Sequence, residues 1–177
     1  AIAEALFGDY NPGGRLAVTF PKSVGQIPFA FPFKPGSDES SETSVYGALY
    51  PFGHGLSYTT FQYSDLAISP SKQGVQGNIS ISCTIKNIGQ REGDEVVQLY
   101  LRDEVSSVTT YTQVLRGFER ITLKPEASHT VHFELTPQEL GIWDKQMNFT
   151  VEPGMFKVMI GSSSKDIRLK GEFEIAQ

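Results

Sequence analysis

The sequence contains one cysteine and one tryptophan among 177 residues, and it has no apolar run near the roughly 20 residues that span a bilayer. A single cysteine excludes an internal disulfide. Cys83 alternates with Ile79, Ile81 and Ile85, so we interpret it as a small core residue of a strand and not as a reactive thiol. The 15 Lys and Arg residues are scattered and outnumbered by 20 Asp and Glu. We therefore expect neither a nucleic-acid nor a membrane partner.

Motifs for metals, cofactors and nucleophilic catalysis are also missing. His129 and His132 stand three apart on a predicted strand, which sends them to opposite faces and excludes joint chelation of one metal. There is no phosphate-binding loop and no G-x-S-x-G motif. We expect no metal, no cofactor and no catalytic triad. No signal peptide opens the chain, but AIAEALFG resembles the last turns of a helix, so the compartment stays open.

What the chain does contain is an ordinary globular balance, 39% hydrophobic and 20% charged, which favours one domain with a full core plus a smaller piece. After Phe61 the pattern has period two, with turn residues about every ten positions, and this is typical of an antiparallel β-sandwich. The predicted strands are Gln62 to Ile68, Gly77 to Asn87, Glu95 to Asp103, Val114 to Leu123, Ser128 to Leu135, Asn148 to Glu152, Met155 to Ser162 and Arg168 to Ile175.

One connection between these strands predicts a short helix. In TPQEL, Thr136 is an expected N-cap, Pro137 suits the first helical position, and Glu139 can reach back to the N-cap amide as a capping box. Trp143 follows directly, and we expect its large ring to plug the end of the sandwich core.

The first 20 residues predict a different kind of unit. Ile2, Ala5 and Leu6 share a helical face, Gly8 can end the helix, and the turn-forming NPGG motif precedes a predicted strand over Leu16 to Phe20. A helix and strand this short cannot bury their apolar faces alone. We interpret residues 1–20 as the remnant of an α/β domain, the alternative being a small appendage on the next domain.

Residues 21–60 form a predicted wrapping loop and interdomain joint, followed by the sandwich over residues 61–177. The loop is proline-rich and aperiodic, and Phe29, Phe31 and Phe33 need a surface to cover. Its last part, LYPFGHGLSYTTF, combines aromatic rings with glycines in a pattern that suits neither helix nor strand. The joint residues are Tyr50, Phe52, Gly53, His54, Gly55, Tyr58 and Phe61.

Five strings resemble the C-terminal part of glycoside hydrolase family 3, the β-glucosidase and β-xylosidase group. They are ALFGDYNPGGRLAVTFPKSVGQIP (5–28), LYPFGHGLSYTTF (49–61), IKNIGQREGDEVVQLYLRD (85–103), LRGFERITLKPEAS (115–128) and VEPGMFKVMIGSSSKDIRL (151–169). The resemblance implies the end of an α/β sandwich domain followed by a fibronectin type III-like domain. With most of the first domain absent, some of Phe29, Phe31, Phe33, Tyr50 and Phe52 should be exposed.

The resemblance also implies where catalysis resides. Family members are retaining glycosidases, with a nucleophile and an acid/base carboxyl about 5 Å apart. In similar enzymes both belong to regions that would precede Ala1, so we carry over no catalytic residue and expect the chain alone to be inactive. The implied partners are the catalytic barrel and α/β sandwich domain of the same polypeptide and its oligo- or polysaccharide substrate. A periplasmic or secreted location is favoured over a cytoplasmic one.

Two local features keep alternatives open. The loop carries Asp38, Glu42 and Tyr46, and in similar enzymes this loop can approach the mouth of the active site, so these three are candidates for contact with a distal sugar. Glu92, Asp94 and Glu95, where a predicted strand begins, are interpreted as ordinary carboxylates of a polar stretch, with no apolar pocket nearby to raise a pKa. The alternative function is a carbohydrate-binding or purely structural fibronectin-like module, in which Trp143 with Tyr111 and Tyr100 would form a sugar-stacking platform.

Overall fold

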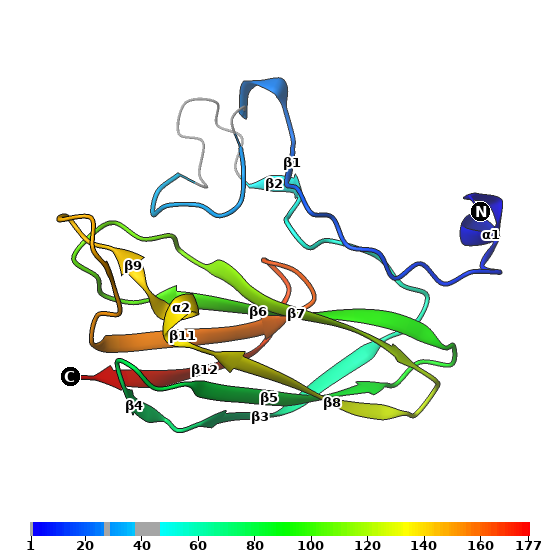
Figure 1. Cartoon of the computed structure of the whole chain (residues 1–177). Helices are drawn as coiled ribbons and strands as arrows, with labels where there is room; N and C mark the ends of the chain where they lie inside the picture. The colour runs from blue at the N-terminus through cyan, green and yellow to red at the C-terminus, as the bar shows by residue number, and fades with distance from the viewer. Residues whose placement is uncertain (1, 27–28, 38–46) are drawn as a thin grey trace.

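The computed structural model describes residues 2–26, 29–37 and 47–177, and it is mainly β (Figure 1). Two sheets face each other. The three-stranded sheet has the order β3-β5-β8 and the five-stranded sheet the order β4-β12-β11-β6-β7. The strands of the first are β3 (Phe61–Ser69), β5 (Ile79–Asn87) and β8 (Ser128–Leu135). Those of the second are β4 (Lys72–Gly74), β6 (Gly93–Asp103), β7 (Val114–Leu123), β11 (Gly154–Gly161) and β12 (Ile167–Ala176).

The core lies between the two sheets and follows from the alternation of their strands. Ile79, Ile81, Cys83 and Ile85 of β5 have no exposed surface, which confirms the predicted buried face and the place of Cys83 in the core. Burial raises the pKa of the Cys83 thiol to about 11, so the thiol stays protonated and unreactive at neutral pH. The facing layer comes from the five-stranded sheet and includes Val97, Leu99, Leu101, Phe156, Val158 and Ile160.

The predicted strands agree with the structure where alternation is clean. β7 and β8 have the predicted limits, whereas Phe149–Thr150 (β10) is shorter than predicted and pairs with Ile142–Trp143 (β9), which was not predicted. The capping box at Thr136 is present and starts α2 (Pro137–Leu140). His129 and His132 are both exposed on β8. No helix among the described residues is long and apolar enough to cross a membrane.

The N-terminal segment begins with a separate helix, α1 (Ile2–Phe7), and then runs over one side of the sandwich (Figure 1). The predicted strand Leu16 to Phe20 is wrong. Only Phe20 belongs to a strand, in the pairing of β1 (Phe20–Pro21) with β2 (Ala48–Tyr50). The Leu16 amide and carbonyl instead bond to His54 O and Gly53 N, at 2.9 and 2.8 Å, so this segment pairs with the joint and not with a sheet.

The loop after β1 contains a short 3-10 helix, η1 (Val24–Gln26), and covers the outer face of the five-stranded sheet. Phe31 stacks on Phe52 at 4.6 Å between ring centroids and meets Tyr100 edge-on at 5.8 Å. This contact explains why Tyr100, on the outer side of β6, is fully buried. The phenylalanine rings of the loop thus cover a surface, as the sequence suggested, and Phe29, Phe31, Phe33 and Phe52 are half-buried while Tyr50 is exposed.

Candidate functional site

The candidate site is the seam where residues 2–20 and the joint meet the sandwich. Its central glycines are required by geometry. Gly53 has a φ of +82°, and a Cβ there would lie 2.2 Å from Gln98 Oε1. A Cβ on Gly55 would lie 2.3 Å from Gly14 O. Because no side chain fits at either position, the joint is pressed directly against β6 on one side and the NPGG turn on the other.

The aromatic residues of the joint divide between inward and outward roles. Phe61 opens β3 and is buried in the core, and Phe52 stacks under the loop. Tyr50 is exposed, stacks on His54 at 5.0 Å and meets Phe20 edge-on at 6.1 Å. His54 therefore packs on a ring, and its backbone carbonyl bonds Leu16. The inward rings fix the joint, and the outward ring contributes to an exposed surface.

Tyr58 and Arg91 hold α1 in place. The Tyr58 hydroxyl donates to the Ala5 carbonyl at 2.7 Å, and the Arg91 guanidinium donates to the Gly8 carbonyl at 2.7 Å. The same guanidinium lies 5.9 Å from the centroid of the Tyr58 ring, within range of a cation-π contact. α1 has no buried residues, so these polar contacts, and not core packing, position it.

Asn11 connects three segments through one side chain. Its Oδ1 accepts from Ser57 Oγ at 3.1 Å and from the Tyr58 amide at 2.8 Å, while its Nδ2 donates to Glu92 O at 3.0 Å. The turn NPGG, the joint and the loop between β5 and β6 are therefore joined at one point.

A buried ion pair lies beneath the joint. Arg15 Nη2 donates to Glu95 Oε2 at 2.8 Å, and Tyr63 donates to the other carboxylate oxygen at 2.7 Å. Burial, and then the charge of Glu95, raise the pKa of the Tyr63 hydroxyl well above its usual range. The interpretation of Glu95 as an ordinary carboxylate of a polar stretch is wrong, because its side chain is buried at 2% exposure; its place in a strand was predicted. Sequence reasoning missed the pair because its members are 80 residues apart.

The remaining predicted site residues lie elsewhere. Asp38, Glu42 and Tyr46 lie outside the described residues. Trp143 was expected in the core, but it is 59% exposed, because β9 turns Trp143 outward and the nearby Leu140, 3% exposed, fills the end of the core. Tyr111 is also exposed whereas Tyr100 is fully buried, so the three rings form no common platform. No cluster of potential metal ligands occurs within residues 2–26, 29–37 and 47–177.

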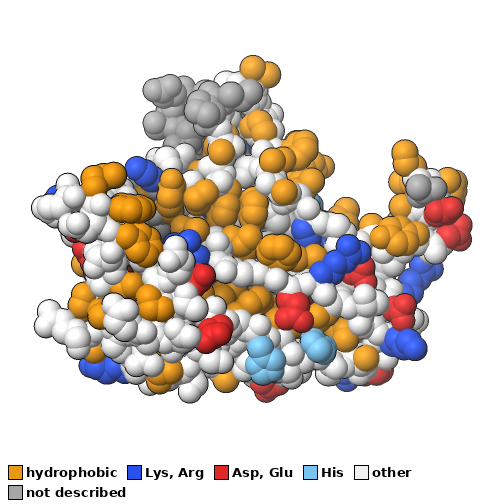
Figure 2. Space-filling view, viewed as in Figure 1, with side chains coloured by type: hydrophobic (Ala, Val, Ile, Leu, Met, Phe, Trp, Pro, Cys, Tyr) orange, Lys and Arg blue, Asp and Glu red, His pale blue; other side chains and the backbone are white. Residues whose placement is uncertain are grey.

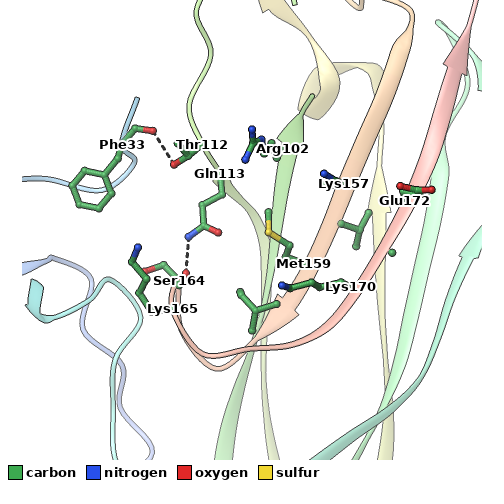
Figure 3. A pocket seen from close by; sticks show the side chains of 13 residues that line it. Phe33, Arg102, Thr112, Gln113, Lys157, Met159, Ser164, Lys165, Lys170 and Glu172 are labelled. Atoms are coloured by element: carbon green, nitrogen blue, oxygen red, sulfur yellow. Dashed lines mark hydrogen bonds between the residues drawn. The ribbon is translucent and has the colours of Figure 1, made fainter. Parts of the chain in front are cut away.

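A groove of about 760 Å³ borders the loop on the outer face of the five-stranded sheet (Figure 3). Phe33 lies at one end of it, and its carbonyl accepts from the hydroxyl of Thr112 at 3.1 Å (Figure 3). The same carbonyl accepts from the Thr112 amide at 2.8 Å. Arg102 of β6 and Lys157 of β11 line the groove, and both form ion pairs with Glu104, at 3.0 and 2.8 Å. These contacts tie the loop to the sandwich, and Glu104 offsets the charge of both cations.

Exposed apolar side chains are concentrated in the N-terminal part of the chain. More than half of the exposed large apolar residues found in the described part of the chain belong to residues 2–58. Phe20, Tyr50 and Leu56 border a shallow apolar hollow of about 570 Å³. Figure 2 shows hydrophobic side chains gathered on this side of the molecule, where β1 and β2 lie in Figure 1. We call residues 2–20 together with 47–58 the apolar strip.

The fold defines a fibronectin type III-like sandwich that carries a segment of a second unit. Residues 95–164 match the Fibronectin type III-like domain, and residues 1–58 match the Glycosyl hydrolase family 3 C-terminal domain. The chain corresponds to the C-terminal portion of family 3 β-glucosidases and β-xylosidases, namely the end of the family 3 C-terminal domain followed by the fibronectin type III-like domain.

Individual relatives agree. A periplasmic beta-glucosidase of Salmonella typhimurium is 43% identical over 99% of this chain, which covers 24% of that protein. A beta-xylosidase of Formosa agariphila is 43% identical over 96% of the chain, again covering 24% of the relative. Among solved structures, a β-glucosidase from Erythrobacter marinus has a TM-score of 0.92 at 38% identity, with 99% of this chain and 23% of that one covered. The chain thus spans about a quarter of the length of these relatives.

Proposed function

We propose that this chain is the non-catalytic portion of a retaining β-glycosidase and that it braces the catalytic domains through the apolar strip. The observation that carries the proposal is that the strip is fixed to the sandwich by polar contacts while its apolar side chains stay exposed. These contacts join Gly8 to Arg91, Asn11 to the Glu92 carbonyl, and Arg15 to Glu95. Contiguous exposed apolar surface of this kind marks an interaction site. The occupant we propose is the remainder of the α/β sandwich domain.

The proposed division of the chain is residues 1–20 as the α/β remnant, 21–60 as the loop and joint, and 61–177 as the sandwich. It is supported by the family 3 match, which ends at residue 58, and by β3, which begins at Phe61. The proposed substrates are β-glucosides or β-xylosides, by analogy with the names of the relatives. The name of the Salmonella relative supports a periplasmic or secreted location.

A chimera tests the bracing role. This chain would replace the corresponding quarter of the Salmonella typhimurium enzyme, and hydrolysis of an aryl β-glucoside and thermal unfolding would be measured. We expect an active chimera that loses activity and thermal stability on Leu56→Asp, because loss of one buried leucine contact costs about 1.5–3 kcal/mol. Phe118→Asp is the matched control, since Phe118 is similarly exposed but lies on β7, away from the strip.

Two results would contradict the proposal. One is measurable turnover by the purified 177-residue chain alone, which we expect to hydrolyse no aryl β-glucoside. The other is equal behaviour of the Leu56→Asp and Phe118→Asp chimeras.

A further inference from the structure

A second concave site lies at an end of the sandwich, between the loop that follows β6, α2 and β9. Figure 1 shows β9 and α1 at opposite ends of the molecule. The cavity has a volume of about 280 Å³. Its floor is formed by the buried side chains of Leu101, Leu140 and Phe156. Aromatic, charged and threonine side chains are among those that line the rest, so an apolar floor meets a rim that can form hydrogen bonds.

The aromatic part of the rim is held in a fixed position. Trp143 meets Phe149 edge-on, with ring centroids 5.5 Å apart. Gly141 allows Phe149 to pack there, because a Cβ on Gly141 would lie 2.3 Å from Phe149 Cζ. Trp143 nevertheless remains 59% exposed, and Tyr111, also on the rim, is 42% exposed. A fixed, exposed indole provides a flat apolar surface for a ligand with an apolar face.

The polar part of the rim has donors and acceptors close together. Arg116 is half-buried, and its Nε atom is buried with no hydrogen-bond acceptor in the described part of the chain. Asp103 accepts one bond, from the Val105 amide at 3.2 Å, and burial raises the pKa of its carboxyl to about 6. Glu139 accepts from the Thr136 amide at 2.8 Å in the capping box. A buried donor without an acceptor is costly unless a ligand or water satisfies it.

Charge and size select the class of ligand. The two carboxyl groups of Asp103 and Glu139 outnumber the one guanidinium, so an anionic ligand is disfavoured. The buried Arg116 Nε donor requires an acceptor, which a cationic group does not provide. Neutral hydroxyl groups both donate and accept, which suits this mixture. The volume is just under the roughly 300 Å³ at which small-molecule pockets begin, which limits the ligand to about one ring.

We propose that this pocket binds one neutral pyranose unit, with the face of the sugar ring on Trp143 and its hydroxyl groups bonded to Arg116 and Asp103. This site would bind sugar on the sandwich itself, and no residue of the apolar strip belongs to it. It rests on the proposed function only for the choice of gluco- and xylo-configured probes.

The single tryptophan makes the test direct, because all indole fluorescence of the chain comes from Trp143. The full chain would be titrated with methyl β-D-glucopyranoside and methyl β-D-xylopyranoside. We expect a saturable change in emission for at least one probe, with dissociation constants in the millimolar range. Glycerol, sodium phosphate and cyclohexanol at equal concentration should give no saturable change. Absence of saturation with both sugars overturns the proposal, and so does cyclohexanol binding as tightly as the sugars.

Variants locate the binding. Tyr111→Ala, on an exposed side chain, and Arg116→Gln should each weaken sugar binding at least about fivefold, equivalent to about 1 kcal/mol. Phe118→Ala, exposed on β7 outside the pocket, should bind as the unmodified chain does. If Arg116→Gln fails to fold by circular dichroism, Tyr111→Ala decides. Trp143→Ala should abolish the saturation-transfer NMR signal of the sugar. Equal binding by the Tyr111→Ala and Phe118→Ala variants overturns the proposal, while the chimera's activity tests bracing independently.

Discussion

The guanidinium of Arg15 and the carboxylate of Glu95 lie 2.8 Å apart, and their side chains are 9% and 3% exposed. Arg15 comes from the segment that matches the family 3 C-terminal domain, and Glu95 from the sandwich. A charge pair with so little water around it constrains both partners, because neither charge tolerates isolation. The pair therefore locks the register of the N-terminal segment on β6.

Removal of one member of this pair should be strongly destabilising. We expect Glu95→Gln to lower the free energy of unfolding by about 3–5 kcal/mol, because it leaves the Arg15 charge buried and uncompensated. Urea unfolding at neutral pH measures this. Lys72→Ala is the control, since it breaks the exposed pair of Lys72 with Glu174 and should cost at most about 1 kcal/mol. Similar losses for both variants would contradict a structural role for the buried pair.

Three glycines, one in the joint and two outside it, allow the effects of steric clash and of backbone strain on stability to be separated. Gly53→Ala should be the most damaging of three substitutions, at about 2–4 kcal/mol, because it combines a positive φ with a clash against Gln98. Gly47→Ala, with a φ of +70° and open space, should cost about 1–2 kcal/mol. Gly14→Ala has neither problem and should be neutral within about 0.5 kcal/mol. Thermal unfolding of the three variants gives the order, and an equal effect of Gly53→Ala and Gly47→Ala would exclude the clash.

Asp103 should make stability depend on pH. Burial, and secondarily the carboxylates of Glu152 and Glu104, raise the pKa of the folded-state carboxyl from 3.8 to about 6, against the hydrogen bond from the Val105 amide. The fold therefore favours the neutral form of the Asp103 carboxyl. The stability gained in this way is fully present below the pKa of the unfolded chain and is lost as the pH rises through 6.

We expect Asp103→Asn to stabilise the chain at about pH 8 by about 1 kcal/mol, a figure reduced because the side chain is partly exposed. At about pH 3 the substitution should have no effect, because the carboxyl is then neutral in both states. Urea unfolding at the two pH values checks the difference. Equal stabilisation at both would show that charge is not the cause.

Tyr58→Phe should release α1 without unfolding the sandwich. A helix of six residues is too short to be stable alone, and the Tyr58 hydroxyl supplies one of its few attachments. Hydrogen exchange of residues 2–8 should become faster, while exchange of β5 and β11 stays unchanged. Unchanged exchange in residues 2–8 would mean that Arg91 alone is sufficient.

Truncation of the smaller Leu140 side chain should destabilise the chain more than truncation of the larger Trp143 side chain. Leu140→Ala removes a buried side chain and should cost about 2–5 kcal/mol. Trp143→Ala removes an exposed ring whose main packing partner is Phe149, and it should cost about 0.5–1.5 kcal/mol. Denaturant midpoints compare them directly. A larger loss for Trp143→Ala would restore the interpretation of this ring as a core plug.

Alternation and capping were readable from the sequence because their causes are local. β7 and β8 follow from period two, and α2 follows from Thr136, Pro137 and Glu139. The seam was not readable in the same way. Burial of Glu95 depends on an arginine 80 residues earlier, and Leu16 bonds to residues of the joint and not to a neighbouring strand. Trp143 was misplaced because large rings usually mark a core, whereas here the two-residue β9 turns it outward.

The seam also fixes an order of events during synthesis. Gly8, Asn11 and Arg15 are held by Arg91, Glu92 and Glu95, at sequence separations of 83, 81 and 80 residues. At about 5–20 residues per second, the ribosome needs on the order of ten seconds to supply these partners. Until then the N-terminal segment lacks the partners that hold it in the folded chain. Synthesis of the sandwich therefore sets the time at which the N-terminal segment can take its folded position.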